Sequence, residues 1–301
     1  MFALTFLGTS ASVPSAERNH PALLVQAGSK RILIDCGEGT QRQLLRSGVG
    51  FRRLDRILLT HGHFDHVLGI PGLFSTLGLR RSADAMTIHG GPGTLDVVAR
   101  MLAGLWGEGR APIPLEFVPL TEGRVMDAGE FTIDCFPVRH RDTDSFGFSF
   151  QSPARRHLRP VRLAALGVPD GPLRRELAEG RPVVIEDGRT VDPEDVLGSP
   201  SGRKKLVVIG DTETTEGLSK YVADADVLVI EATFLDRDAP IARDYGHLTV
   251  AEAALLAATN NVKQLVLTHL SGRYRDEEIL GEATKTFPTS RIAADFDHII
   301  I

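Results

Sequence analysis

The sequence has 301 residues, of which 42% are hydrophobic, and its formal net charge is −5. This length allows one large domain or two average ones, and the acidic balance excludes a protein that coats nucleic acid with a generally basic surface. The two cysteines, Cys36 and Cys135, match no zinc-ribbon spacing and indicate reduced, buried thiols. No apolar run is long enough to span a bilayer, and the first residues are typical of a strand and not of a signal peptide, so we expect a cytoplasmic protein.

The first half of the chain alternates short apolar runs with glycine-rich turns, a pattern that predicts strands with a few helices between them. The expected strands are Leu4–Leu7, Ala22–Gln26, Arg31–Ile34, Arg56–Leu59, Met86–His89, Phe131–Val138 and Phe146–Phe150. The expected helices are Gly37–Ser47, Ile70–Leu79 and Thr94–Leu105.

Residues 151–204 interrupt this rhythm with a stretch rich in proline, glycine and charge. From Ala154 to Arg175 there are six arginines and one acid, Asp170, which gives a local charge of about +5. Within an acidic protein, such an island is where contact with phosphates would have to occur. The alternative is a solvated, poorly packed surface loop.

The second half has a content similar to that of the first. The expected elements are the strands Lys205–Ile209, Val227–Ile230 and Leu265–Leu267 and the helices Val250–Thr259 and Asp276–Thr286. Two sheets packed face to face, with helices outside, would accommodate both halves. We therefore expect an α/β fold in a single domain, 1–301, with residues 151–204 as an insert.

The clearest chemical signal is the run His61-Gly62-His63-Phe64-Asp65-His66. Three imidazoles and one carboxylate lie within six residues, directly after an expected strand. Imidazole and carboxylate together suit zinc and its neighbours in the first transition row. A tight loop can aim His61 and His63 at one ion and then turn Asp65 and His66 towards a second.

Three further candidate ligands stand at the carboxyl ends of expected strands: His140, Asp211 and His269. Each alone is a weak indication, because a single histidine at a strand end is more often structural. Together with the first cluster they complete a set of seven ligands for two ions.

These motifs resemble the metallo-β-lactamase superfamily and, over nearly the whole chain, its short-form ribonuclease Z family. The stretches that carry the resemblance are Phe6–Thr9, Ile34–Gln41, Leu59–His63, Gly171–Leu173, Glu186–Arg189, Gly210–Thr212, Glu231–Phe234 and Leu267–His269. The resemblance implies a metallo-β-lactamase-type αββα sandwich of two mixed sheets with outer helices. It also implies that 151–204 is a protruding substrate-binding arm.

The resemblance also assigns roles to the ligands. His61, His63 and His140 would hold one zinc ion, Asp65, His66 and His269 would hold the other, and Asp211 would bridge both. Manganese or iron could occupy the same ligands.

The activity implied is that of a zinc-dependent endoribonuclease that removes the 3′ trailer from precursor tRNA. A metal-activated hydroxide would attack the phosphodiester and leave a 3′-hydroxyl on the tRNA and a 5′-phosphate on the trailer. Asp65 could also accept a proton from the attacking water. His247 would be a general acid or phosphate-stabilising group, oriented by Glu231. The simpler interpretation of His247 is a histidine beside a helix that Thr249 caps.

Substrate contacts are expected in three places. The candidate residues are Arg18, Asn19, Arg155, Arg156, Arg159, Gly171, Pro172, Ser271 and Arg273. The expected assembly is a homodimer in which the arm of one subunit holds the tRNA for the active site of the other, with no membrane and no DNA involved.

Two other functions compete with this interpretation. The first is a small-molecule hydrolase of the same superfamily, such as a phosphodiesterase, thioesterase or lactonase, because fold alone does not define a substrate. A basic arm argues against it. The second is an RNA-binding module without activity, which would be expected to lack ligands, whereas all seven positions are filled.

Overall fold

The computed structural model describes residues 1–301 except 155 and 201. The chain divides into two compact units, each described here by itself. Residues Met1–Gln151 together with Lys205–Ile301 form the main unit, and Ser152–Lys204 form the arm.

The first sheet of the main unit has seven strands in the order β16-β1-β2-β3-β4-β5-β6. Their bounds are β16 (His298–Ile300), β1 (Phe2–Gly8), β2 (Ala22–Ala27), β3 (Lys30–Ile34), β4 (Leu54–Leu58), β5 (Met86–Gly90) and β6 (Leu115–Pro119). The pairs from β16 to β3 are antiparallel, and those from β3 to β6 are parallel.

The second sheet also has seven strands, in the order β15-β14-β13-β12-β9-β8-β7. Their bounds are β15 (Ser290–Ile292), β14 (Gln264–Thr268), β13 (Val227–Glu231), β12 (Lys205–Ile209), β9 (Ser145–Gln151), β8 (Thr132–Val138) and β7 (Gly123–Asp127). The pairs between β12 and β15 are parallel, and the others are antiparallel.

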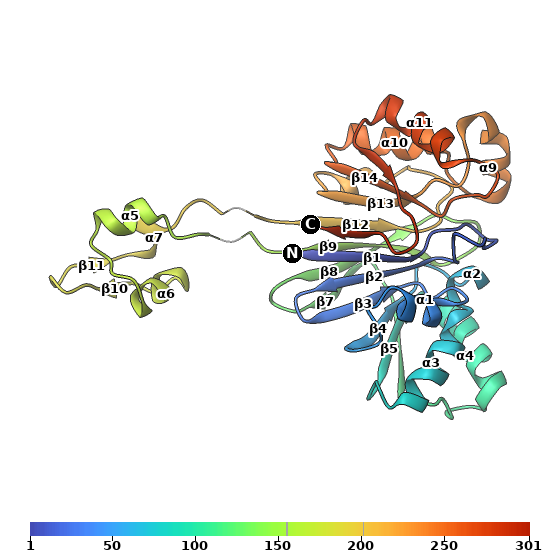
Figure 1. Ribbon diagram of the computed structural model, residues 1–301, viewed down its shortest axis with the longest axis horizontal. Helices are drawn as coiled ribbons and strands as arrows, with labels where there is room; N and C mark the ends of the chain where they lie inside the picture. The colour runs from blue at the N-terminus through green and yellow to red at the C-terminus, as the bar shows by residue number, and fades with distance from the viewer. Residues whose placement is uncertain (155, 201) are drawn as a thin grey trace. The chain divides into compact units, whose positions relative to one another are not determined.

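Helices cover the outer faces of both sheets (Figure 1). Those of the first half are α1 (Thr40–Arg46), α2 (Phe64–Val67), α3 (Gly69–Arg80) and α4 (Pro92–Trp106). Those of the second half are α8 (Ser219–Val222), η1 (Asp236–Asp238), α9 (Ala239–Tyr245), α10 (Val250–Thr259) and α11 (Asp276–Thr286). No helix in the described part of the chain is long and apolar enough to cross a membrane.

Three apolar clusters hold these layers together. Phe2, Phe148 and Val229 belong to the cluster between the sheets, where alternate residues of facing strands meet. Separate clusters lie beneath the helices of each half. Burial of each large side chain contributes about 1.5–3 kcal/mol. The αββα sandwich expected from the sequence is thereby confirmed.

The topology brings several strand ends to one edge of the main unit. β12, β13 and β14 run parallel, and β8 shares their direction because it is separated from β12 by the antiparallel β9. Their carboxyl ends therefore lie together, where polar side chains can meet without interrupting the hydrophobic core.

The arm is a folded unit with its own small core. Its elements are α5 (Pro160–Ala165), α6 (Pro172–Ala178), β10 (Val183–Val184), β11 (Thr190–Val191) and α7 (Pro193–Val196). The core is a cluster of buried aliphatic residues: Leu163, Val168, Leu177, Val183, Ile185, Val191 and Val196. The segment is therefore packed, and the alternative of an unpacked surface loop is wrong.

Candidate metal centre

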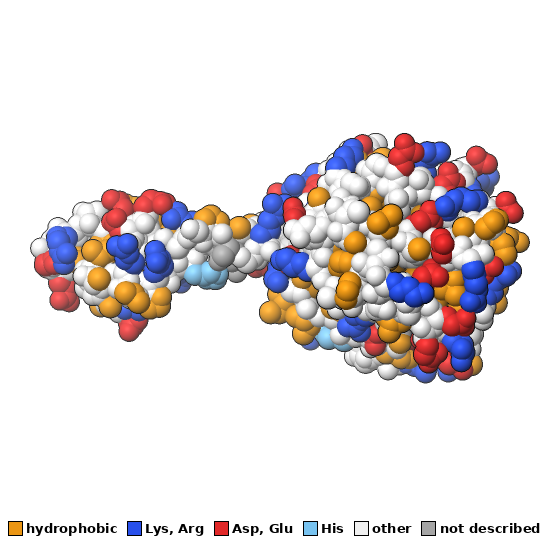
Figure 2. Space-filling model, turned by 90° about the horizontal axis from the view of Figure 1, so that it is seen from above, with side chains coloured by type: hydrophobic (Ala, Val, Ile, Leu, Met, Phe, Trp, Pro, Cys, Tyr) orange, Lys and Arg blue, Asp and Glu red, His pale blue; other side chains and the backbone are white. Residues whose placement is uncertain are grey.

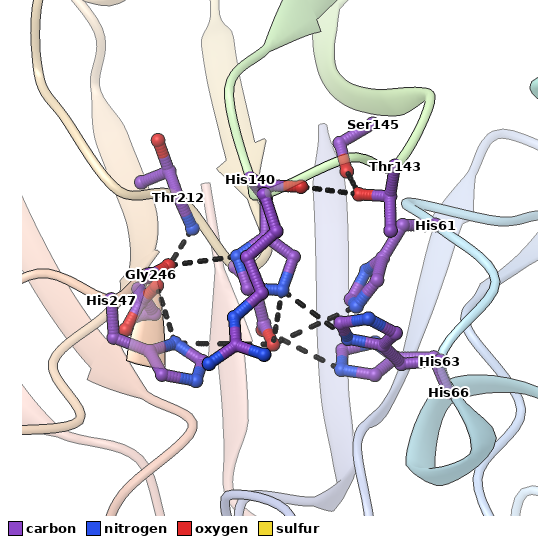
Figure 3. A network of polar contacts seen from close by, with 12 residues as sticks. His61, His63, His66, His140, Thr143, Ser145, Thr212, Gly246 and His247 are labelled. Atoms are coloured by element: carbon purple, nitrogen blue, oxygen red, sulfur yellow. Dashed lines mark hydrogen bonds and ion pairs between the residues drawn. The ribbon is translucent and has the colours of Figure 1, made fainter. Parts of the chain in front are cut away.

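The histidine run follows β4 and enters α2. His61 and His66 are buried, and His63, just before α2, is partly exposed. The other candidate ligands come from the strand ends: His140 after β8, Asp211 after β12 and His269 after β14. Figure 3 shows His61, His63, His66 and His140 converging on one small volume.

One group of ligand atoms gathers around Oδ2 of Asp211. Nε2 of His61 lies 3.7 Å from this oxygen, and Nε2 of His140 lies 3.8 Å from it. Nδ1 of His63 is 3.2 Å from Nε2 of His140. These four residues form one candidate metal site.

A second group gathers around the other oxygen, Oδ1 of Asp211. Nε2 of His269 lies 3.3 Å from it, and Nε2 of His66 lies 3.5 Å from it. Oδ2 of Asp65 is 3.5 Å from Nε2 of His269 and 3.6 Å from Nε2 of His66. Asp211 therefore directs one carboxylate oxygen to each group, as a bridge between two ions requires.

The residues fit divalent metal ions in two respects. Among the described residues, His61 Nε2, His66 Nε2, His269 Nε2 and Asp211 Oδ1 are buried without a hydrogen-bond partner, a costly arrangement for a protein alone. Moreover, ligands held at about 2.05 Å in a tetrahedron stand about 3.3 Å apart. The observed separations of 3.2–3.8 Å are close to that value.

The surrounding protein fixes the orientation of the imidazoles of His66 and His61. Nδ1 of His66 donates to Oδ2 of Asp35 over 2.8 Å. The hydroxyl of Thr60 also donates to this carboxylate, so it can accept a hydrogen bond from Nδ1 of His61, 3.1 Å away. Both rings then turn an Nε2 lone pair towards the centre, as metal-binding histidines do.

The same arrangement recurs on the second sheet. The hydroxyl of Thr233 donates to Oε2 of Glu231 over 2.5 Å and lies 3.0 Å from Nδ1 of His269. Nδ1 of His140 donates to the carbonyl of Gly246 over 2.7 Å. Four imidazoles are thus held through Nδ1, which leaves Nε2 available for an ion.

His247 lies beside the candidate ligands and forms a hydrogen bond with Glu231. Its Nδ1 is 3.0 Å from Oε1 of Glu231, which also accepts from the backbone N–H of Thr212. Burial lowers the pKa of His247, but the carboxylates of Glu231 and Asp211 outweigh it and raise the pKa to about 9. Burial holds the pKa of His61 well below its usual value, which keeps this ligand neutral.

Sequence reasoning assigned no role to several residues that orient this centre: Asp35, Thr60, Thr212, Thr233 and Gly246. Two signals in the sequence point to three of them. Thr60 and Thr212 are neighbours of candidate ligands in the chain, and Asp35 directly follows an apolar strand.

The expected substrate residues of the main unit differ in availability. Arg18 is engaged within the fold, because it donates to Thr9, to the carbonyl of Ala293 and to Asp276. Asn19 donates to the carbonyl of Glu38. By contrast, Ser271 is half-buried and Arg273 is exposed, close after His269 in the chain.

In the arm, the expected substrate residues also differ in availability. Arg156 forms a bidentate pair with Glu194, whereas the exposed Arg159 helps to line a cavity of about 450 Å³. Gly171, with φ of 126°, precedes α6, and Pro172 begins it. Arg155 lies outside the described residues. These assignments remain predictions.

The sandwich fold and the buried histidine–aspartate centre define a metal-dependent hydrolase of the metallo-β-lactamase class. Residues 178–270 match the family described as beta-lactamase superfamily domain, and residues 2–156 match the one described as anti-Pycsar protein Apyc1. Ribonuclease Z of Bradyrhizobium diazoefficiens is 84% identical over the whole of both chains, and that of Archaeoglobus fulgidus is 37% identical, with 98% of this chain and 96% of the relative covered. The chain belongs to the ribonuclease Z family.

Solved structures give the same answer. Human tRNase Z, short form, is 27% identical and superposes with a TM-score of 0.68 over 99% of each chain. A long form of ribonuclease Z from yeast, 18% identical, has a TM-score of 0.65 over 99% of this chain and 41% of its own. At that identity, the yeast protein supports the shared fold alone.

Proposed function

We propose that this protein removes 3′ trailers from precursor tRNA, with two zinc ions held by the seven ligands. The bridging position of Asp211 is the observation that carries this proposal, because it pairs two ligand groups at one buried site. The 84% identity to a ribonuclease Z supports the choice of substrate. We further propose that the enzyme acts in the cytoplasm as a homodimer, with the arm as a tRNA-binding exosite that serves the partner subunit.

The residues of the chain have distinct tasks in this reaction. When bound, the ions would supply Lewis-acid chemistry, lowering the pKa of a water molecule and neutralising phosphate charge. Asp65 would help to hold one ion and can accept the proton of the attacking water. His247 donates a proton to the leaving oxygen, and Glu231 keeps the imidazole in place through Nδ1.

A mapped cleavage assay tests the proposal. The purified, zinc-loaded protein is incubated with an end-labelled precursor tRNA that carries a 3′ trailer, and the products are resolved to the nucleotide. We expect one cut next to the discriminator nucleotide and none with Asp211→Ala. Hydrolysis of bis-p-nitrophenyl phosphate without any tRNA cleavage would favour a small-molecule hydrolase instead.

A further inference from the structure

Arg141 directly follows the ligand His140 and has no role in the function proposed above. Its Nε donates to the carbonyl of Tyr245 over 2.9 Å, and its Nη2 donates to the carbonyl of Asp244 over 2.9 Å. These are the last two carbonyls of α9, which have no partner within the helix. The guanidinium therefore caps α9 with two donors and a positive charge, as basic groups do at helix ends.

The capped end of α9 is the point from which His247 departs. Gly246 ends the helix in a left-handed conformation, with φ of 72°, and His247 follows it. A Cβ atom on Gly246 would lie 2.8 Å from Cγ of Arg141, so the side chain packs directly on this turn. Arg141 thereby controls the direction in which the chain enters His247.

The backbone of Arg141 makes a second connection. Its N–H donates to Oε2 of Glu213 over 3.0 Å, two residues beyond Asp211. With φ of 47°, Arg141 is in the left-handed region that a non-glycine residue adopts only where its surroundings impose it. One residue thus joins the loops of His140, Asp211 and His247.

We infer that Arg141 is a positioning residue for His247. Through the end of α9 it fixes the imidazole beside the candidate metal ligands, with Nδ1 4.0 Å from Oδ2 of Asp211, where the proposed function has it donate a proton to the leaving oxygen. The carbonyl of Gly246, which orients His140, belongs to the same turn. This inference rests on the proposed function, because it needs His247 to act on a phosphodiester.

The test compares Arg141→Met with Arg139→Met, a matched control on the other side of His140. Arg139 is 69% exposed and forms surface pairs with Glu213 and Glu216 over 3.6 and 3.5 Å, which contribute little. The kcat and KM for bis-p-nitrophenyl phosphate and precursor tRNA are measured, with bound zinc and thermal unfolding recorded for each protein.

For Arg141→Met we expect kcat on precursor tRNA to fall by about 10- to 100-fold, because misplacement by about 1 Å can cost about 100-fold. The loss on bis-p-nitrophenyl phosphate should be smaller, because p-nitrophenolate can leave without a proton. The KM and the zinc content should stay within about twofold, and Arg139→Met should behave like the parent protein. Arg141→Lys keeps the positive charge but has only one nitrogen for the two carbonyls, so its kcat should lie between those of Arg141→Met and the parent protein. An unchanged kcat on precursor tRNA in a folded Arg141→Met protein would overturn the inference.

A double-mutant cycle with His247→Ala shows whether Arg141 acts through this histidine. We expect Arg141→Met to add no further loss once His247 is absent. Losses that multiply, or a kcat that falls in Arg141→Met but not in His247→Ala, would overturn the inference. Failure of the wild type to cut precursor tRNA, with the small diester still hydrolysed, would instead overturn the proposed substrate, and the cycle would then be measured on an alkyl phosphodiester, whose leaving oxygen still requires a proton.

Discussion

The metal centre and the arm differ in whether their polar and charged side chains have partners within the protein. At the centre, polar atoms of His61, His66, Asp211 and His269 are buried and, among the described residues, lack a hydrogen-bond partner. In the arm, acidic and basic side chains lie close together on the visible surface (Figure 2). The arginines with carboxylate partners are Arg156, Arg174, Arg175, Arg181 and Arg189. The centre therefore needs an ion from outside, whereas most of the arm's charge is balanced within the arm.

Removing the metal should give the largest effect, because it leaves the buried ligand atoms of the metal centre without a partner. We expect chelation by EDTA to abolish hydrolysis of bis-p-nitrophenyl phosphate. The melting temperature should fall by roughly 5–10 °C, because a ligand at about 1,000 times its dissociation constant stabilises by about 4 kcal/mol. Activity and thermal unfolding are measured before chelation, after it, and after addition of Zn²⁺, Mn²⁺ or Fe²⁺. Full activity in a metal-free protein would contradict the two-ion centre.

Asp35 tests the layer that orients the ligands. Asp35→Asn keeps the size of the side chain but removes the charge that accepts from His66 and Thr60. We expect zinc affinity to fall by about 10- to 100-fold, the usual cost of losing such a partner. The affinity is measured by competition with a chromophoric chelator. Asp55→Asn is the control, because Asp55 only faces Lys30 at 3.8 Å on the surface; equal losses in both variants would refute the role of Asp35.

The arm offers a comparison between paired and unpaired arginines. Arg159 and Arg162 line the 450 Å³ cavity and have no ion pair within the described residues. Replacing both with Gln should weaken precursor tRNA binding by about tenfold. The slope of log K against log salt should become shallower by about 1.4–1.8, at about 0.7–0.9 per phosphate contact.

The matched control for the arm is Arg156→Gln with Arg175→Gln. This variant loses the same two charges, but from side chains already held by Glu194 and Glu179. Its salt slope, measured by filter binding on the same tRNA, should change by less than half as much. Equal changes in both double variants would mean that net charge alone governs binding by the arm.

Short-range patterns predicted the main elements of the fold. The expected helix Ile70–Leu79 corresponds to α3, and the expected strand Leu265–Leu267 to β14. Several strands were missed. The short strands β10, β11, β15 and β16 have only two or three residues each, too few to show a period. The strands β6 and β7 were missed because they are half-exposed edge strands in which apolar and polar residues do not alternate regularly. An alternating pattern arises when one face of a strand is buried, and β6 and β7 have no fully buried face.

Contacts between residues far apart in the chain could not be predicted, because local patterns carry no information about them. The ligands could be proposed because each follows an apolar strand, but the pairing of Asp35 with His66 joins residues 31 positions apart. The charge estimated for Ala154–Arg175 likewise omitted Glu194, which lies 38 positions beyond Arg156. Residue types therefore predicted the chemistry, whereas the neutralisation of each charge depended on the folded structure.

The smallest expected effect is on the pH dependence of stability and comes from His89, a buried histidine that is not a candidate metal ligand. Its Nε2 lies 2.8 Å from Nη1 of Arg56, so the neutral ring accepts a hydrogen bond from a cation. Burial, and then the charge of Arg56, lower the pKa of His89 to about 4. The unfolded chain, with a pKa of about 6.5, therefore binds this proton first as the pH falls. The stability that His89 contributes is complete above pH 6.5 or so and is lost on acidification towards pH 4.

The variant His89→Gln retains an acceptor for Arg56 but cannot titrate. Urea unfolding at pH 7.5 and pH 4.5 gives the free energy of unfolding of both proteins. We expect the wild type to lose about 1–3 kcal/mol more than the variant over this range. This is the amount that corresponds to a pKa about 2.5 lower in the folded than in the unfolded protein, after allowance for the partial exposure of the ring. Zinc content should be equal in both, because His89 holds no ion. A difference in stability that stays constant with pH would show that His89 has the same pKa in the folded and the unfolded protein, which would contradict a buried neutral ring that accepts a hydrogen bond from Arg56.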